Sequence, residues 1–180
     1  MNLPDRLEVN RFREPFLALY RDLDAAIAAI APVCVLSGRC CRFQEYGHTL
    51  FLSEPEALLL ITDAPIPSRP LDGGETCPWQ DQAGRCTARE ARPLGCRLYY
   101  CDPAYETAGA SLSETFIGRL KELVDRLDLP WNYRPLHRHL EAASAESRYP
   151  GETLPVVGRI TSDVVDSNVR QITHVHRPEA

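Results

Sequence analysis

Three things are missing from this sequence: an excess of positive charge, a long apolar run, and cysteine over most of its length. The 180 residues carry a formal net charge of −5, so a basic face that binds nucleic acid or anionic lipid is not expected. No stretch approaches the roughly 20 apolar residues of a membrane-spanning helix. The opening residues, MNLPDRLEVNRFREPF, are charged where a signal peptide would be apolar. We therefore expect a cytoplasmic protein with neither a nucleic-acid nor a membrane partner.

Familiar catalytic motifs are missing as well. The chain has no Cys-x-x-Cys redox motif, no phosphate-binding loop and no Gly-x-Ser-x-Gly nucleophile elbow. A catalytic thiol is usually a single cysteine beside a base, whereas this chain has seven cysteines. The sequence alone therefore leaves enzymatic activity undecided.

Cysteine is absent from residues 42–76 and from the last 79 residues, so all the cysteines fall in the first part of the chain. They are Cys34, Cys40, Cys41, Cys77, Cys86, Cys96 and Cys101. An odd number of cysteines in a reducing compartment argues against a disulfide framework. Their neighbours include the turn residues Gly38, Gly84, Pro93 and Gly95, whereas cysteines that only fill a core would lie within periodic helices more often. Thiolates gathered on loops favour a soft metal site, with zinc, iron–sulfur or copper(I) as the candidates.

Hydrophobic periodicity predicts helices on both sides of this cysteine-rich region. Residues 11–31 have apolar side chains close to a 3.6-residue period, and Pro32 should end that helix. Residues 113–127 form the second periodic stretch, with Ser111 and Glu114 read as its capping box and Pro130 as its stop. A further short helix is expected near Pro135.

Between these helices, the sequence predicts short elements and loops. Residues 48–52 form an extended run, and a capping box of Ser53 and Glu56 starts a short helix to about Thr62. Prolines and glycines make residues 63–75 a loop. The sequence DQAG predicts a turn that brings Cys77 and Cys86 close together. We predict a helix-rich α+β fold: a small single domain with an irregular, cysteine-rich, metal-binding middle. The domain with its flanking helices covers residues 1–142, and residues 143–180 form a linker and a C-terminal extension that packs on the domain or trails from it.

The cysteine pattern resembles a known family. CVLSGRCCR, then CPW, then Cys86, then RPLGCRLYYC is similar to the YkgJ-type cysteine-cluster family, a zinc- or iron-chelating domain whose pattern begins C-x2-C-x2-C-C. The resemblance spans about residues 34–101 and implies a bound metal ion or cluster, either zinc or an iron–sulfur cluster, held by the seven cysteines. It leaves the physiological role and any protein partner open.

One position departs from the family pattern, because Ser37 stands where the family has its second cysteine. A hydroxyl is a poor ligand for a soft metal. Either an oxygen, a histidine or water completes the N-terminal site, or that site has decayed and Cys34, Cys40 and Cys41 are remnants or serve one shared centre. His48 is the histidine closest in sequence to the cysteines. The other histidines, read as surface or capping residues, are the pairs His137 with His139 and His174 with His176.

The division of the cysteines between centres is open at this stage. Adjacent residues of an extended chain point to opposite faces, so Cys40 and Cys41 are expected to serve two centres. The four later cysteines then form one closed site and the first three a second, or one of the adjacent pair joins the later group. Arginines near the thiolates would suit their negative charge; the candidates are Arg39, Arg42, Arg85, Arg89, Arg92 and Arg97.

Two function classes fit these residues. The first is a metal-binding protein whose zinc or iron–sulfur centre is structural or redox-active. The alternative is a metalloenzyme or oxidoreductase with an under-ligated iron–sulfur or zinc centre, for which Ser37 gives the only support.

Overall fold

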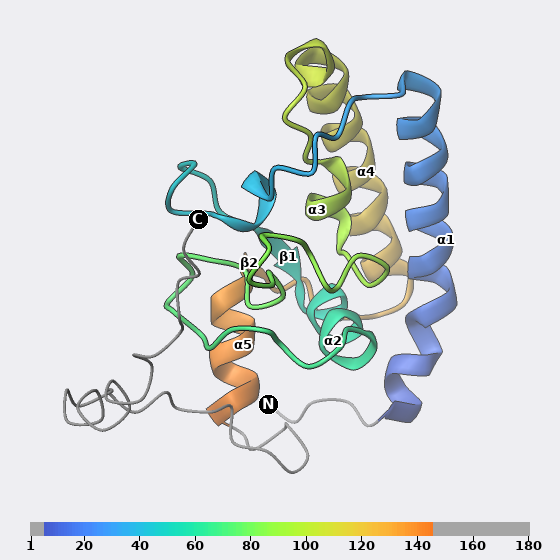
Figure 1. The fold of residues 1–180 in the computed structure, drawn as a ribbon. Coiled ribbons are helices and arrows are strands. Elements are labelled where there is room, and N and C mark those ends of the chain that lie inside the picture. The colour runs from blue at the N-terminus through green and yellow to red at the C-terminus, as the bar shows by residue number, and fades with distance from the viewer. Residues whose placement is uncertain (1–5, 146–180) are drawn as a thin grey trace, which may run out of the picture.

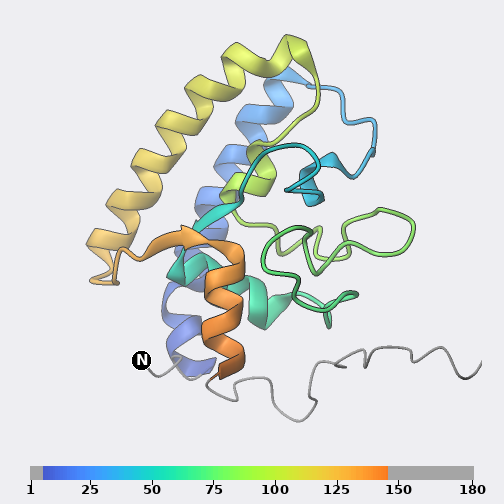
Figure 2. The same ribbon diagram turned by 90° about the vertical axis from the view of Figure 1, so that its left-hand side faces the viewer.

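Two long antiparallel helices form one side of the molecule, and the cysteine-bearing loops lie on the other (Figures 1 and 2). The computed structural model describes residues 6–145. Helix α1 (Arg6–Ile30) packs along α4 (Glu106–Arg126), with side chains such as Phe16, Leu23 and Leu120 fully buried between them. The apolar faces that periodicity predicted are therefore the faces that form this core.

The first helix confirms the prediction for residues 11–31 but begins five residues earlier, at Arg6. Its end lies just before Pro32, where Ala31 takes a left-handed conformation with φ of 55°. The proline cannot continue a helix, and the left-handed residue turns the chain away from it. The chain then runs directly into the first cysteine loop.

The start of the second long helix differs from the prediction. The capping box of Ser111 and Glu114 is wrong, because α4 already begins at Glu106 and Ser111 lies inside it. A 3-10 turn, η2 (Pro103–Tyr105), precedes the helix, and the Asp102 side chain accepts a hydrogen bond from the backbone N–H of Ala104 at 2.9 Å. An Asp cap followed by Pro is a strong start signal, and it prevails here over the later Ser-x-x-Glu.

A small antiparallel sheet lies between the helical pair and the rest of the chain. Strand β1 (Phe51–Ser53) pairs with β2 (Tyr133–Pro135), Leu52 lying opposite Arg134. Each strand leads into a helix: β1 into α2 (Glu54–Asp63) and β2 into α5 (Leu136–Ala145). The helix-rich α+β prediction is confirmed, as are the Ser53–Glu56 capping box and the helix near Pro135. Strand β2 was not predicted.

The cysteine region has an apolar core of its own. Trp79, Leu52, Leu136 and Leu140 are almost fully buried there together with Cys41 and other apolar side chains. Helix α5 closes this second core and runs to Ala145, past the domain boundary predicted at 142. The rest of the predicted extension lies outside the described residues. Within the described part of the chain, no helix is long and apolar enough to cross a membrane.

A buried carboxylate connects the two cores. The Oε1 atom of Glu56 accepts hydrogen bonds from the backbone N–H of Leu94 at 2.9 Å and from the hydroxyl of Tyr20 at 3.1 Å. Its Oε2 atom accepts from the backbone N–H and the hydroxyl of Ser53, at 3.0 and 2.9 Å. Glu56 thereby joins α1, the β1–α2 junction and the start of α3 (Leu94–Leu98). Burial raises the pKa of this carboxyl above its ordinary value, although the donors oppose the shift.

Replacing Glu56 by Gln is expected to destabilise the fold by about 1–3 kcal/mol, the cost of leaving a buried polar group unsatisfied. Each carboxylate oxygen accepts from a backbone N–H, so the amide NH₂ of E56Q faces a second donor whichever way it is turned. Urea unfolding measures the loss, and E122Q at an exposed position of α4 is the matched control. Equal stabilities of the two variants would contradict this role.

The same measurement has a pH dependence of known sign. Because the folded state raises the pKa of Glu56, it binds the proton more tightly than the unfolded chain does. Stability from this group therefore falls as pH rises from the ordinary Glu pKa through the raised one. E56Q is expected to lack that component, whereas E122Q is expected to keep it.

Candidate metal centre

All seven cysteines line one cavity of about 460 Å³. Three chain segments bring them there: the loop after α1 with the 3-10 turn η1 (Arg39–Cys41), the hairpin region around residues 77–86, and α3 with the residues that follow it. Among the lining residues, Cys34 and its neighbours Val35 and Leu36 are exposed, whereas Cys41 and Cys77 are buried. The structure thus collects residues that are up to 67 positions apart in sequence.

Cys40 and Cys41 face the same cavity, contrary to the reasoning from extended backbone. Gly38 takes a left-handed conformation with φ of 68°, and the chain then forms the η1 turn, in which the N–H of Cys41 bonds to the carbonyl of Gly38 at 3.1 Å. In this turn the two sulfur atoms lie 4.0 Å apart. The premise that the pair points to opposite faces is therefore wrong, because Arg39–Cys41 is not extended.

The predicted turn at DQAG is confirmed, and it places the hairpin cysteines beside the first loop. The backbone N–H of Gly84 bonds to the carbonyl of Asp81 at 3.0 Å, and Gln80 pairs with Cys86 across the turn. The backbone N–H of Cys77 bonds to the carbonyl of Cys41 at 2.7 Å. The thiols of Cys77 and Cys86 both interact with that of Cys41. Cys40, Cys41, Cys77 and Cys86 consequently lie near one another.

A buried glutamine holds the first cysteine loop against the hairpin. The Nε2 atom of Gln80, a residue 2% exposed, donates to the carbonyls of Gly38 at 3.1 Å and Gly84 at 3.0 Å. The two glycines are in close contact, since a Cβ on Gly38 would lie 2.2 Å from the carbonyl oxygen of Gly84. Sequence analysis missed Gln80, because nothing in CPWQ distinguishes it from a surface glutamine.

Arg97 fixes the third segment in place but does not itself line the cavity. Arg97 is 9% exposed and donates to the carbonyls of Arg92 at 2.8 Å and Glu90 at 2.9 Å, with its guanidinium over the ring of Tyr20. It does not line the cavity, so the expectation that it neighbours the thiolates is not met. It instead shapes the loop that leads into α3, where Cys96 is located.

Of the other arginines singled out, three line the cavity and two do not. Arg85, Arg89 and Arg92 are wall residues. Arg39 and Arg42 stack over the ring of Tyr46, and Arg42 also pairs with Glu45. The wall has no Asp, Glu or Lys among the described residues. The cavity is therefore cationic in a chain whose net charge is −5.

The thiols differ in acidity for physical reasons. A hydrogen bond from Cys41 lowers the pKa of Cys40 to about 6 and that of Cys86 to about 7, with Arg92 adding to both effects. The same hydrogen bonds raise the pKa of Cys41, and burial raises that of Cys96. The lowered pKa of Cys40 and Cys86 favours the thiolate, which is the donor form that soft metals bind.

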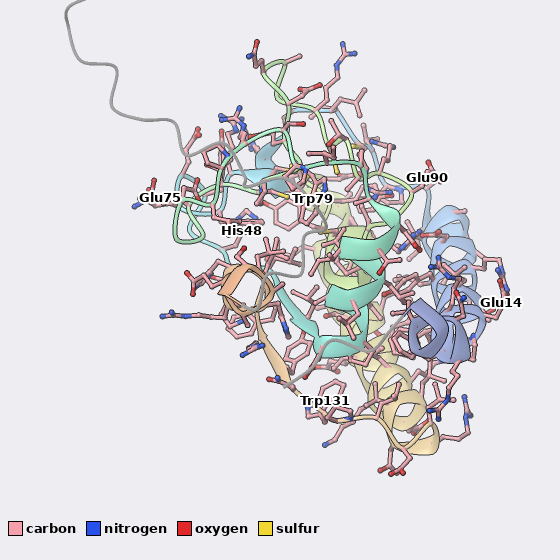
Figure 3. All side chains as sticks on the ribbon, turned by 90° about the horizontal axis from the view of Figure 1, so that it is seen from below. Glu14, His48, Glu75, Trp79, Glu90 and Trp131 are labelled. Atoms are coloured by element: carbon pink, nitrogen blue, oxygen red, sulfur yellow. The ribbon has the colours of Figure 1, made fainter. Side chains whose placement is uncertain are left out.

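Ser37 and His48, the two residues considered for completing the N-terminal site, both lie close to cysteines. The hydroxyl of Ser37 is 3.7 Å from the sulfur of Cys101, within the cavity wall. His48 (labelled in Figure 3) stacks on Tyr99 at 4.7 Å between ring centroids, with its Nε2 atom 3.5 Å from the carbonyl of Cys40. It lines a neighbouring cavity whose wall also includes Cys40 and Cys96. The imidazole Nδ1 is buried without a partner among the described residues.

The other histidines are not at the thiols. His139 is buried: its Nε2 atom lies 3.0 Å from the carbonyl of Leu52, and its Nδ1 accepts from Arg134 at 3.2 Å. Burial lowers its pKa, so it is a neutral core residue rather than the surface residue expected. His137 packs against Gly74. His174 and His176 lie outside the described residues.

The donor set fits a thiolate-bound metal by chemistry, although the thiols are spread around the wall. No group of three Cys, His, Asp or Glu side chains in residues 6–145 is arranged around a single point for one ion. Cys40, Cys41, Cys77 and Cys86 nevertheless lie near one another, and the remaining three cysteines line the same space. Soft donors of this kind, without carboxylates, match zinc or an iron–sulfur cluster.

Comparisons with known proteins add no assignment: no family model, curated protein or solved structure matches the chain. The resemblance to the YkgJ-type family stays a prediction from the cysteine pattern.

Gly38 offers a direct test of how the loops meet. G38A is expected to destabilise the protein by more than the roughly 1–2 kcal/mol of left-handed strain, because its Cβ also overlaps the Gly84 carbonyl. G47A is the matched control, since Gly47 has φ of 64° and a Cβ added there would meet nothing within 4 Å. Urea unfolding and the rate of thiol alkylation in the folded state report the effect. Equal behaviour of the two variants would show that the glycine contact does not hold the site together.

Proposed function

We propose that this chain is a metal-binding protein that holds an iron–sulfur cluster through cysteine thiolates in the cavity. The observation that carries the proposal is that seven cysteines line one cavity whose described wall has no carboxylate. Thiolates favour soft metals, and iron–sulfur clusters are held by cysteine thiolates. The group around Cys41, with Cys40, Cys77 and Cys86, is the first candidate for the ligand set.

The size of the cavity favours a cluster over a single zinc ion. A structural zinc site brings four ligands to about 2.1–2.3 Å from the ion and leaves little space between them. The cavity that the thiols line, together with apolar and arginine residues, has a volume of about 460 Å³. The guanidiniums of Arg85, Arg89 and Arg92 line the same space and would offset the negative charge of a thiolate-bound cluster. When bound, such a cluster supplies electron-transfer chemistry.

Anaerobic purification without added metal is the first test. We expect protein with iron and sulfide in elemental analysis and a broad visible absorption that bleaches on reduction. C41S and C77S are expected to lose most of the iron, because each removes a thiol from the buried group. C34S, at the most exposed cysteine of the wall, tests whether the ligand set extends beyond that group, and S111A on the exposed surface of α4 is the control. Colourless protein with stoichiometric zinc, or protein with neither metal, would overturn the iron–sulfur proposal.

A second candidate function is a metalloenzyme or oxidoreductase with an incompletely ligated centre. The distance of 3.7 Å between the Ser37 hydroxyl and the Cys101 sulfur favours it, because an oxygen lies beside a cysteine at the position where the YkgJ-type pattern has a further cysteine. Catalytic metal sites keep such a position for water or substrate.

S37C tests the incomplete centre by adding a thiol beside Cys101. If the position is open, azide is expected to change the visible spectrum of the wild-type protein, and S37C is expected to abolish that response. S111C adds the same thiol on the exposed surface of α4 and serves as the control. A wild-type spectrum that is insensitive to azide would argue against an open position.

A further inference from the structure

The three arginines of the cavity wall share two features: they make no ion pair among the described residues, and they line one cavity. Within the described part of the chain, ion pairs with Asp or Glu are made by Arg13, Arg21, Arg42, Arg97, Arg119 and Arg138. Arg85, Arg89 and Arg92 make none there, although this is an acidic protein. Three arginines therefore line one cavity whose described wall has no carboxylate.

Their positions divide the three into an inner residue and two rim residues. Arg92 is half-buried, and its Nε donates to the carbonyl of Arg89 at 3.0 Å. Arg85 and Arg89 are exposed while they also line the cavity. Charge at an exposed rim is screened by water and acts weakly on groups further inside. These two side chains would interact more strongly with an anion that enters the cavity and accepts charge-assisted hydrogen bonds from them directly.

The rest of the wall is suited to an apolar body. Trp79, Leu50, Leu60 and Leu136 contribute apolar surface, and Tyr99 and Tyr100 add aromatic rings. Figure 3 shows Trp79 inside the molecule, whereas Trp131 lies toward its edge. Small-molecule sites are concave, mostly apolar, about 300–1,000 Å³ in volume, and carry a few polar groups that orient the ligand. This cavity meets each of those conditions.

We propose that the cavity binds a small organic anion, a carboxylate or a phosphate ester with an apolar or aromatic body. Arg85 and Arg89 hold the anionic group, and Trp79 with the leucines of the wall contacts the body. This inference deepens the proposed function, since it names the class of ligand that the same cavity binds. It rests on the proposed function only in one respect: the metal and the anion would occupy the same cavity.

Isothermal titration calorimetry on the full-length protein as purified, in a zwitterionic buffer, tests the proposal. The probes share one ring: phenyl phosphate and phenylacetate carry the anion, benzyl alcohol is neutral and benzylamine is cationic. Saturable binding is expected for at least one anion and at least tenfold weaker binding for the neutral and cationic probes. The two anionic probes distinguish a phosphate ligand from a carboxylate.

R85Q and R89Q are each expected to weaken binding of the preferred anion by about tenfold, the loss of one charge-assisted hydrogen bond. The matched control is the double variant R11Q/R126Q, which removes two exposed guanidiniums that do not line the cavity. It changes net charge as R85Q/R89Q does but is expected to bind the anion like the wild type.

Three outcomes would overturn the anion site: neither anion binds, the neutral probe binds as tightly as the anions, or R85Q/R89Q keeps the wild-type affinity. Elemental analysis of the same samples reports metal content separately. Anion binding without iron would sink the iron–sulfur proposal and leave the anion site standing. Iron without anion binding would overturn the anion site and leave the iron–sulfur proposal standing. The rim arginines would then serve only to balance the charge of the cluster.

Discussion

The buried carboxylate of Glu56 is the interaction on which the cysteine region depends. It accepts hydrogen bonds from Tyr20 on the first helix, from Ser53 at the end of β1 and from the N–H of Leu94 at the start of α3. A carboxyl group 1% exposed is tolerated only because these donors satisfy both oxygens. The segment that carries Cys96 and Cys101 is thereby fixed to the helical layer, so one wall of the cavity has a rigid support.

The other walls are held by backbone contacts rather than by regular structure. The Cys77–Cys41 hydrogen bond joins the hairpin to the η1 turn, and Gln80 bonds to carbonyls on both sides of the contact between Gly38 and Gly84. Loops can hold converging thiols only if their own backbone groups are satisfied. Here most of the backbone bonds are made within each loop, and the bonds of Cys77 to Cys41 and of Gln80 to Gly38 join the two segments into one unit.

Sequence patterns predicted the elements whose signals are local. Hydrophobic periodicity located both long helices, and the spacing of Ser53 and Glu56 located the start of α2. The start of α4 was missed because two local patterns competed and Asp102 with Pro103 prevailed over Ser111. The strand β2 is three residues long and is defined only by its partner, so no periodicity indicates it.

The turns around the cysteines predicted in outline that the cysteines gather in one place, but they did not predict the geometry of the cavity. Cys40 and Cys41 share a face because Gly38 is left-handed, and that conformation is fixed by contact with Gly84, which is distant in sequence.

The charge of the cavity wall follows from the same arrangement and constrains what occupies it. Three guanidiniums that share a partly enclosed space repel one another, and a low local dielectric strengthens that repulsion. The thiols of Cys40 and Cys86 offset part of it when they ionise, and the pKa of both is lowered, first by a hydrogen bond from Cys41 and to a smaller extent by Arg92. The exposed Arg85 and Arg89 are at the rim, toward solvent. Coulomb attraction falls with distance and with exposure to water. Negative charge on the thiol group therefore attracts Arg92, the inner arginine, more strongly than it attracts Arg85 and Arg89. Arg85 and Arg89 at the rim are therefore stabilised most by an anion that enters from solvent. The same wall in this way contacts the negative charge of the thiol group at its inner part and an organic anion at its rim.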